Sequence, residues 1–507
     1  MLNHLIRKDF QQITSTLQGL LVKIDTRTVL AFGLPFIIYV STLAPTIYNL
    51  DSAELTTAAA TGGLMRATGY PLYLSIGYLW SHIPIGDVGY RMNLFSAFNG
   101  ALTIALAERI FRRWQINNWA TFGALGLLAG ATYFWALSLI AEVYTLHTAL
   151  TAALILLLIR WSDHPTPLNL TLVGLVTGLS LSNHAATVLL IPGVVWYILA
   201  CASRQALRPK TLALTLGSLL IGLSFYLYLP LRYLAEPAFN YAGYYNANGL
   251  FHPINLTTFE GFWRVVTGRD FSWFMFSYNW RGLLIEGLIF IKQLWRAFFV
   301  IGIAPGILGM VVLLRRNWRL GSMLLLMFLG HALFYIDYRA LDKELMFLPS
   351  YLIWALWIGV GFQWLLDWIR NEREPSKKDS WILNLVHLVI AGTVLLTFAW
   401  NWPLVDLSND WSVRERGEDI MQQVEHNALI FGHWDTIPVI QYLQLVEGQR
   451  PDIQTVNRFQ IYVEHIESMI RQNIRSRPIY IDSLIGTLGQ TYQTEQAGPL
   501  YRLMRKD

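Results

Sequence analysis

Long apolar stretches separated by short polar connections make up most of the chain between residues 28 and 400. A helix needs about 20 mostly apolar residues to cross a bilayer. Eleven stretches approach that length, although the fifth and sixth are short and the eighth has an indistinct start. The pattern predicts an α-helical polytopic membrane protein with about eleven transmembrane helices. The predicted spans are residues 28–48, 91–110, 119–137, 143–161, 168–182, 185–201, 211–230, 296–314, 320–337, 346–368 and 381–400.

Lys and Arg residues concentrate in alternate connections, which predicts an orientation because basic loops stay in the cytoplasm. Eleven spans fit this alternation without a break. The N-terminal residues 1–27 show no cleavage site of a signal peptide and are expected to form a cytoplasmic amphipathic helix at the interface. The tail after residue 400 then lies outside. The cations on the cytoplasmic side are Arg7, Lys8, Lys23, Arg109, Arg112, Arg113, Arg204, Arg208, Lys210, Arg315, Arg316, Arg319, Arg370, Arg373, Lys377 and Lys378.

Two connections on the opposite side, residues 49–90 and 231–283, are expected to be large external loops of the transmembrane domain 28–400. In the first, the run PLYLSIGYLWSHIP at 71–84 is too short to span and favours a helix lying at the interface. The second is too polar to span and too aromatic for a plain linker. We expect an ordered loop packed over a site, with a helix near 257–267.

The sequence changes character again after residue 400. The runs NALIFGHWD, DIQTVN and RPIYI are typical of short buried strands. Helical patterns at 435–447 and 461–475 separate them. Residues 401–507 are therefore expected to form a small extracytoplasmic α/β domain.

Composition agrees with a membrane protein and excludes several functions. The chain of 507 residues is 54% hydrophobic and 14% charged, whereas soluble chains carry about 25% charged residues. A net charge of +5, placed mainly on one side, indicates membrane orientation and no nucleic-acid partner. The single cysteine, Cys201, excludes an internal disulfide and a thiolate metal site.

Two carboxylates, Asp51 and Glu54, directly follow the first predicted span. Asp at an N-cap with Glu three positions later forms a capping box, and Gly62-Gly63 would end such a helix. This structural explanation is compatible with a chemical one, because residues three apart share a helix face. Neighbouring carboxylates at a desolvated boundary also raise the pKa of one of them, as general-base chemistry requires.

Other polar residues fall on the same predicted side, although polar groups at membrane depth are costly. His147 and His184 can be hydrogen-bonded core residues, and a zinc site is disfavoured because no HExxH-like spacing occurs. Arg232 can extend to the interface, or it can join Arg339 and Lys343 in holding an anion. The polar residues of this side are Glu142, His147, Asn183, His184, Arg232, Asp337, Arg339, Asp342, Lys343 and Glu344.

These groups suit glycosyl transfer from a sugar linked to a polyprenyl phosphate. The lipid would enter between helices, and cations would neutralise the leaving phosphate. A carboxylate would deprotonate the acceptor hydroxyl as it attacks the anomeric carbon. Because phosphate leaves readily, neither a strong general acid nor a metal or other cofactor is required.

The blocks LDSAEL, GYPLYL, AEVYTLHTAL, GLSLSNHAATVLLIPG, YLPLRY and DKELMFLPSYLIWALWIGVG, together with WDTIPVIQYLQLVEGQRPDIQTVN, resemble the protein O-mannosyltransferase-like proteins of the GT-C glycosyltransferase superfamily. The resemblance covers nearly the whole chain and implies an inverting, lipid-sugar-dependent transferase. It implies that Asp51 is the base, with Glu54 as its neighbour. Thr68 stands where the family often has His before Gly-Tyr-Pro. The positions expected to bind substrate are Tyr70, Glu142, Tyr144, His147, Asn183, His184, Arg232, Arg339 and Lys343.

The resemblance does not fix the sugar, and the acceptor can be a protein, a glycan or a lipid. A transporter or flippase of a lipid-linked sugar is the alternative, although neither a midplane site nor an inverted repeat is visible. A third interpretation, a membrane anchor that presents the outer domain to a partner, leaves the polar residues unexplained. We expect a multi-pass protein of a prokaryotic plasma membrane, surrounded by lipid, with its N-terminus in the cytoplasm.

Overall fold

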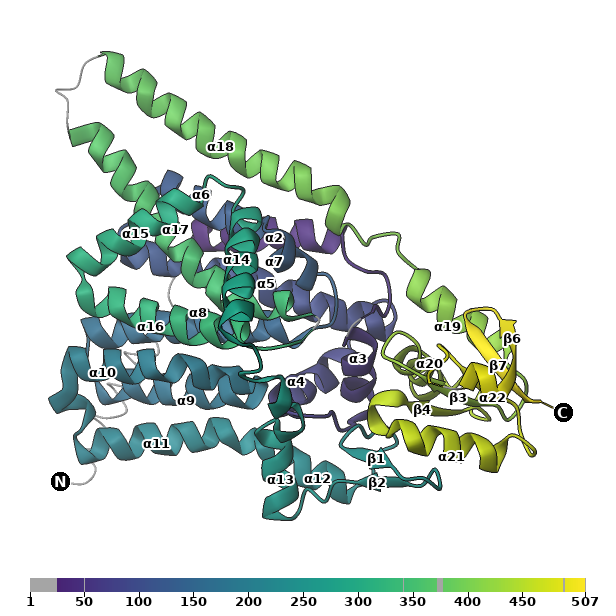
Figure 1. Cartoon of the computed structure of the whole chain (residues 1–507). Helices are drawn as coiled ribbons and strands as arrows, with labels where there is room; N and C mark the ends of the chain where they lie inside the picture. Colours follow the sequence, from purple (N-terminus) through teal and green to yellow (C-terminus); the bar gives the residue numbers. More distant parts are fainter. Residues whose placement is uncertain (1–24, 50, 341, 372–376, 487, 507) are drawn as a thin grey trace.

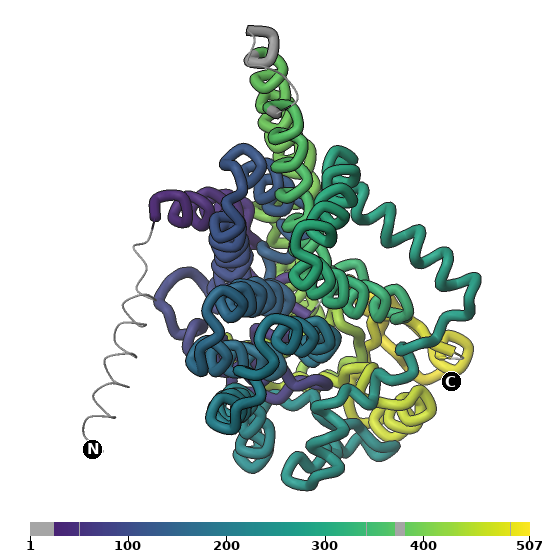
Figure 2. Tube along the Cα trace, turned by 90° about the vertical axis from the view of Figure 1, so that its left-hand side faces the viewer, coloured from purple at the N-terminus to yellow at the C-terminus, as the bar shows by residue number. Residues whose placement is uncertain are grey.

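A computed structural model describes residues 25–49, 51–340, 342–371, 377–486 and 488–506, so the predicted N-terminal interfacial helix lies outside the described residues apart from its last three. Long helices lie side by side in the larger part, and the C-terminal sheet lies beyond one end of them (Figure 1). Many of these helices are seen nearly end-on when the molecule is viewed from the side that faces away from the C-terminal sheet (Figure 2). The chain thus has a helical part and a smaller mixed part at one of its ends.

Every predicted span corresponds to helical structure. The bundle helices are α2 (Thr26–Ser41), α5 (Val88–Arg113), α6 (Asn118–Ala129), α7 (Thr132–Leu137), α8 (Val143–Asp163), α9 (Pro167–Asn183), η1 (Ala185–Leu190) with α10 (Ile191–Ala206), α11 (Pro209–Leu223) with η2 (Ser224–Leu227) and α12 (Tyr228–Leu234), α14 (Trp280–Ala297), α15 (Ile303–Arg316), α16 (Trp318–Ile336), η4 (Lys343–Phe347) with α17 (Leu348–Asn371), and α18 (Lys377–Val405).

Seven helical segments of the described chain are both long and apolar enough to cross a membrane. The other predicted spans are shorter or interrupted: α2 has 16 residues, and a break at Gly130 divides the third span into α6 and α7. The chain is therefore a multi-span membrane protein, and the count of eleven remains a prediction. The seven segments are Val88–Arg113, Val143–Asp163, Ala185–Ala206, Pro209–Leu234, Trp318–Ile336, Lys343–Arg370 and Trp381–Val405.

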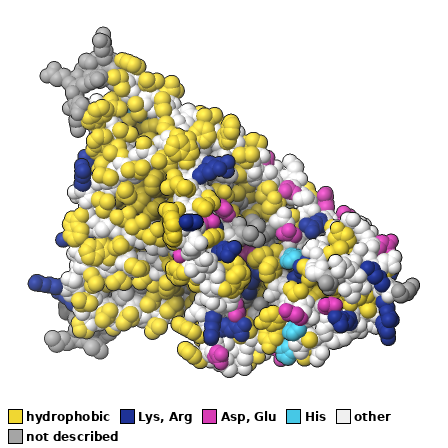
Figure 3. All heavy atoms as spheres, viewed as in Figure 1, with side chains coloured by type: hydrophobic (Ala, Val, Ile, Leu, Met, Phe, Trp, Pro, Cys, Tyr) yellow, Lys and Arg dark blue, Asp and Glu magenta, His cyan; other side chains and the backbone are white. Residues whose placement is uncertain are grey.

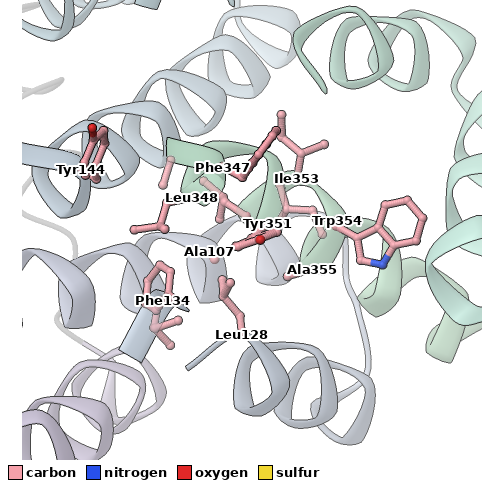
Figure 4. Close-up of a cluster of buried hydrophobic side chains, with 14 of the residues drawn as sticks. Ala107, Leu128, Phe134, Tyr144, Phe347, Leu348, Tyr351, Ile353, Trp354 and Ala355 are labelled. Carbon is pink, nitrogen blue, oxygen red and sulfur yellow. The ribbon is translucent and has the colours of Figure 1, made fainter. Parts of the chain in front are cut away.

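One segment forms the centre of the bundle. In Lys343–Arg370, 89% of the apolar window is buried, against 17% in Trp381–Val405. Figure 4 shows side chains of α17, including Tyr351, gathered with Leu128 of α6 and Phe134 of α7. The peripheral helices instead present apolar side chains outward, and apolar atoms cover most of the helical surface in Figure 3. This exposed apolar surface requires lipid as its solvent.

Glycines allow two helices of this bundle to pack closely. A Cβ atom added at Gly178 of α9 would lie 2.3 Å from the Leu219 carbonyl oxygen of α11. One added at Gly222 of α11 would lie 2.6 Å from the Leu179 nitrogen. Small residues at such contacts let helix backbones approach in a membrane, where burial of apolar surface does not drive association.

The two large loops fold into short elements, as their composition indicates. The loop between α2 and α5 contains α3 (Ser52–Thr61) and α4 (Pro71–Ser81), and the latter confirms the short helix expected at 71–84. The loop after α12 contains the antiparallel strands β1 (Gly243–Tyr245) and β2 (Phe251–Pro253), then α13 (Phe259–Val266) and η3 (Arg269–Phe274). Helix α14 was not predicted, and the span expected to begin at 296 begins as α15 at Ile303.

The C-terminal part is a mixed sheet of order β4-β3-β5-β7-β6. The three predicted runs form the parallel strands β3, β4 and β5, and β7 pairs antiparallel with both β5 and β6. Helix α19 and the strands β6 and β7 were not predicted. The elements are α19 (Ser412–Gln423), β3 (Leu429–Gly432), α20 (Ile437–Leu445), β4 (Gln454–Asn457), η5 (Arg458–Gln460), α21 (Val463–Asn473), β5 (Ile479–Ile481), α22 (Leu488–Thr491), β6 (Tyr492–Ala497) and β7 (Leu500–Arg505).

The orientation predicted from the basic residues can be tested by cysteine labelling. In a Cys201→Ala background, a cysteine at the exposed position Asn409 should react with an impermeant maleimide on intact cells. A cysteine at the exposed position Lys210 should react only after the membrane is permeabilised. The reverse pattern of labelling would invert the predicted topology.

Candidate active site

The Asp51–Glu54 segment begins α3, and its geometry contradicts the capping-box interpretation. Asp51 has helical backbone angles (φ −75°, ψ −3°), and its side chain accepts no capping hydrogen bond. The other half of the prediction is confirmed, because Gly62 ends the helix in the left-handed conformation at φ 62°. The Asp51 carboxylate is therefore available for a partner outside its own helix.

That partner is Arg66, a residue that the sequence analysis missed. Its Nη2 atom lies 2.9 Å from Asp51 Oδ1 and 3.2 Å from Glu54 Oε2, so one guanidinium nitrogen joins both carboxylates. The Asp51 side chain is 23% exposed, whereas that of Glu54 is 0% exposed. The sequence signal for Arg66 was its positive charge in a loop that is predicted to be external and poor in Lys and Arg. Only Asp51 of the pair is open to a substrate.

The C-terminal part also reaches these carboxylates. The Trp434 indole N–H donates to Glu54 Oε2 at 2.9 Å, and the Arg66 guanidinium lies 4.0 Å from the centre of the Trp434 ring. The second Glu54 oxygen, Oε1, is buried without a hydrogen-bond partner among the described residues. Glu54 is thus held from one side by a residue 380 positions away in the sequence.

The surroundings of Glu54 change its ionisation. Burial raises the pKa of its carboxyl to about 8, and the charge of Asp51 acts in the same direction. Arg66 and the Trp434 hydrogen bond oppose this rise by stabilising the carboxylate. The net effect of these surroundings favours the protonated form of Glu54.

Two more carboxyl groups lie near Asp51. Glu142, which is 2% exposed, directly precedes α8, and Asp342 directly precedes η4. Burial raises the pKa of each carboxyl, and the negative charge of Asp51 raises both further. The structure therefore brings the predicted site residue Glu142 close to Asp51. Among the described residues, no three His, Cys, Asp or Glu side chains are arranged to hold a metal ion.

A row of rings leads from this loop into the bundle. Tyr70 takes the left-handed conformation at φ 43° just before Pro71 begins α4, and its ring centre lies 5.7 Å from that of His184. His184 also lies 5.5 Å from Tyr144 and 5.2 Å from His147. The predicted residues Tyr70, Tyr144, His147 and His184 are therefore neighbours.

The two histidines also make contacts that support a structural role. His184 Nδ1 accepts from the Ala186 N–H at 3.1 Å, so the neutral ring carries its proton on Nε2. His147 Nδ1 lies 3.4 Å from the Thr187 hydroxyl. Asn183 donates to the Val143 carbonyl at 3.3 Å. Hydrogen bonding in the core accounts for these atoms, while His147 Nε2 and Asn183 Oδ1 are buried without a partner in the described chain.

The three predicted cations lie in different surroundings from Arg66. Arg232 Nε donates to the Gly62 carbonyl at 2.5 Å and so closes the C-terminal end of α3. Lys343 is buried and forms an ion pair with Glu286 at 2.8 Å. Arg339 is exposed, and its backbone N–H donates to the Phe274 carbonyl at 2.9 Å. Arg66, rather than these residues, is the cation that contacts the carboxylate pair.

The chain is similar in sequence to a protein family and to two proteins that are all described as protein O-mannosyl-transferases. Residues 51–208 match the family described as the protein O-mannosyl-transferase TMEM260 N-terminal domain. The chain is 23% identical over 471 residues to protein O-mannosyl-transferase tmem260 of Dictyostelium discoideum, covering 83% of this chain and 56% of that protein. It is 24% identical over 447 residues to protein O-mannosyl-transferase TMEM260 of Mus musculus, covering 83% and 61%. The chain thus spans about three fifths of the length of these relatives.

The fold has solved counterparts. ArnT from Cupriavidus metallidurans, crystallised with undecaprenyl phosphate, superposes with a TM-score of 0.56 at 12% identity, covering 94% of this chain and 97% of that one. Its apo form gives a TM-score of 0.55 at 12% identity, covering 96% and 98%.

By fold, the protein is a polytopic membrane protein similar to ArnT, with a small C-terminal sheet region. Its similarity in sequence and in fold confirms the predicted resemblance to the protein O-mannosyltransferase-like proteins of the GT-C superfamily.

Proposed function

We propose that the protein is an inverting glycosyltransferase that moves a sugar from a polyprenyl-phosphate donor to a hydroxyl group of a protein at the outer membrane face. The observation that carries this proposal is the Asp51–Arg66–Glu54 arrangement. It combines one accessible carboxylate, one buried carboxyl and a cation that joins them.

Asp51 is the general base in this proposal because its carboxylate is the exposed member of the pair. It takes the proton of the acceptor hydroxyl while that oxygen attacks the anomeric carbon. The bond from the anomeric carbon to the phosphate oxygen breaks, and the phosphate leaves with the bonding electrons. Attack opposite to the leaving group inverts the anomeric configuration.

Arg66 has two functions in this scheme. Its contacts hold Asp51 beside Glu54, and a guanidinium has five N–H donors, of which these contacts use one nitrogen. The remaining donors can bind an oxygen of the leaving phosphate as charge develops there. The neutral form of Glu54 keeps the local charge balanced, with one cation against the single carboxylate Asp51.

Support for the two substrates comes from the relatives. The ArnT crystal structure of the same fold holds undecaprenyl phosphate, which supports a lipid-phosphate donor. The curated relatives are named as protein O-mannosyl-transferases, which supports a protein acceptor. The apolar surface of the helices would let a polyprenyl chain approach the site through the bilayer (Figure 3).

The proposal is tested with the purified full chain in lipid nanodiscs. It is supplied with a panel of radiolabelled polyprenyl-phosphate sugars and Ser/Thr-containing acceptor polypeptides. We expect label to enter the polypeptide and to be released by β-elimination, as an O-linked sugar is. Transport of the intact lipid-linked sugar across proteoliposome membranes without transfer would instead support the transporter alternative.

The ionisation of Glu54 predicts a pH dependence of the reaction. As pH rises through about 8, Glu54 loses its proton, competes with Asp51 for Arg66 and adds negative charge near the phosphate donor. We expect turnover to fall and the donor KM to rise across that range. The Glu54→Gln variant should lack this alkaline decline, and an unchanged decline in that variant would assign it to another group.

The pH dependence of folding stability provides a second measure of the ionisation of Glu54. The folded protein binds the Glu54 proton more tightly than the unfolded chain, whose carboxyl has the ordinary pKa of 4.5. The stabilisation is therefore present in full below about pH 4.5 and is lost as pH rises through about 8. In Glu54→Gln, this part of the pH dependence of the melting temperature should disappear.

A further inference from the structure

The candidate active site contains one side chain from the C-terminal part of the chain. Trp434 lies in the connection between β3, which ends at Gly432, and α20, which begins at Ile437. Helix α20 packs directly against α3, the helix that carries Glu54, and the two lie next to each other in Figure 1. The tertiary fold therefore places this connection at the carboxylates.

Trp434 makes three contacts there. Its indole N–H donates to Glu54 Oε2 at 2.9 Å, and the Arg66 guanidinium lies over its ring at 4.0 Å. The ring of Phe459 lies 4.4 Å from the Trp434 ring, centre to centre. One side chain thus contacts both Glu54 and Arg66, and a residue that follows β4 supports it.

The fold of the C-terminal sheet fixes the position of this connection. The His433 backbone N–H donates to Asp482 Oδ2 at 2.5 Å, just beyond the end of β5. Arg458, just beyond the end of β4, pairs with Asp482 Oδ1 at 3.0 Å, and both side chains are at least 92% buried. The ends of the three parallel strands are therefore tied together directly beside Trp434.

We propose that Trp434 is a positioning residue of the active site, and that the C-terminal part of the chain completes the catalytic arrangement. The inference rests on the proposed function. The indole N–H holds Glu54 and the indole ring holds Arg66, so that Arg66 stays in contact with Asp51. Trp434 acts through these two residues and does not itself touch the reacting atoms.

The first test compares Trp434→Phe with Trp434→Ala in the full chain. Phe keeps an aromatic face for Arg66 but removes the N–H donor, so we expect roughly a tenfold fall in kcat. Ala removes both contacts and should lower kcat roughly a hundredfold. The matched control is Trp411→Phe, at an exposed tryptophan just before α19, which should retain wild-type activity. Wild-type kcat in both Trp434 variants would overturn the proposal.

The pH profile separates positioning from a general loosening of the structure. The Trp434 hydrogen bond lowers the pKa of Glu54 by favouring its charged form. Its removal should therefore move the alkaline decline of turnover to higher pH in Trp434→Phe. A lower kcat with an unshifted decline would contradict the proposed action through Glu54.

A double-mutant cycle tests the contact independently of catalysis. The free energies of unfolding of Trp434→Phe, Glu54→Leu, which removes the acceptor oxygens, and the double variant are compared with that of the wild type. Residues in direct contact are expected to be non-additive. Additive effects would refute the Trp434–Glu54 contact even if the enzyme were active. Coupling in a protein that transfers no sugar would leave the contact established and reject the proposed function.

Discussion

Asp51→Asn is expected to abolish transfer while the protein remains folded. Asn has nearly the volume of Asp, and the Asp51 side chain makes no capping hydrogen bond that the change could remove. A general base typically contributes 10²–10⁴-fold in rate, so turnover should fall by roughly that factor. The measurement is the initial rate of sugar transfer by purified, monodisperse variants, together with their melting temperatures.

Asp87→Asn provides a matched control. Asp87 also lies in the loop between α2 and α5, but its carboxylate accepts from the Tyr90 N–H at 2.6 Å and so caps α5. The Oδ2 atom of Asp87 also lies 3.5 Å from Arg414 Nη1. Asn keeps the capping oxygen but removes the charge that faces Arg414, so we expect this variant to have a slightly lower melting temperature and to retain activity. The assignment of Asp51 as the base would fail if Asp51→Asn kept wild-type turnover.

Arg66→Met should have the second largest effect. The change keeps a long side chain but removes the charge that joins Asp51 to Glu54 and, in the proposed mechanism, binds the leaving phosphate. Loss of one electrostatic contact to a transition state typically costs roughly 10²–10³-fold. We expect a fall in kcat of that order and a higher donor KM. Arg66→Lys should recover only part of the activity, because its ammonium group restores the charge but lacks the fixed fork of a guanidinium.

Arg264→Met is the appropriate comparison for this charge removal. Arg264 pairs with Asp270 at 2.8 Å, and their side chains are 43% and 41% exposed. Exposed pairs contribute little, so activity and stability should change slightly. Equal loss of activity in the Arg66 and Arg264 variants would indicate a nonspecific effect of charge and would remove Arg66 from the mechanism.

The helical part was largely predictable because lipid restricts the choice of structure. Within a bilayer, backbone groups must be satisfied inside the span, so each long apolar run became helical. Helix α14 was missed because its sequence WRGLLIEGLIFIKQLWRA places charged residues among the apolar ones. Its amphipathic pattern does not resemble an apolar span. Whether each run forms one continuous helix was also not predictable, as the break between α6 and α7 shows.

The C-terminal strands were also only partly predictable from the sequence. The runs that became β3, β4 and β5 are mostly buried, and β3 and β5 are also mostly apolar, so they were recognised. The pair β6 and β7 has exposed polar residues, and its only clear sequence signal is the turn at Gly498, where φ is 56°. Strands of such an antiparallel pair lack the continuous apolar pattern on which recognition depends.

By itself, the sequence determined that the chain is a multi-span membrane protein, that Asp51 and Glu54 lie at the start of one short helix, and that this helix ends at Gly62. These are local consequences of apolar length, residue spacing and glycine conformation. Only the tertiary structure decided that Asp51 faces Arg66 instead of capping its helix, and that Glu54 meets Trp434 from 380 residues away. Packing of α20 against α3 creates that contact. A contact between distant segments depends on how whole elements pack, which no local pattern of residues specifies.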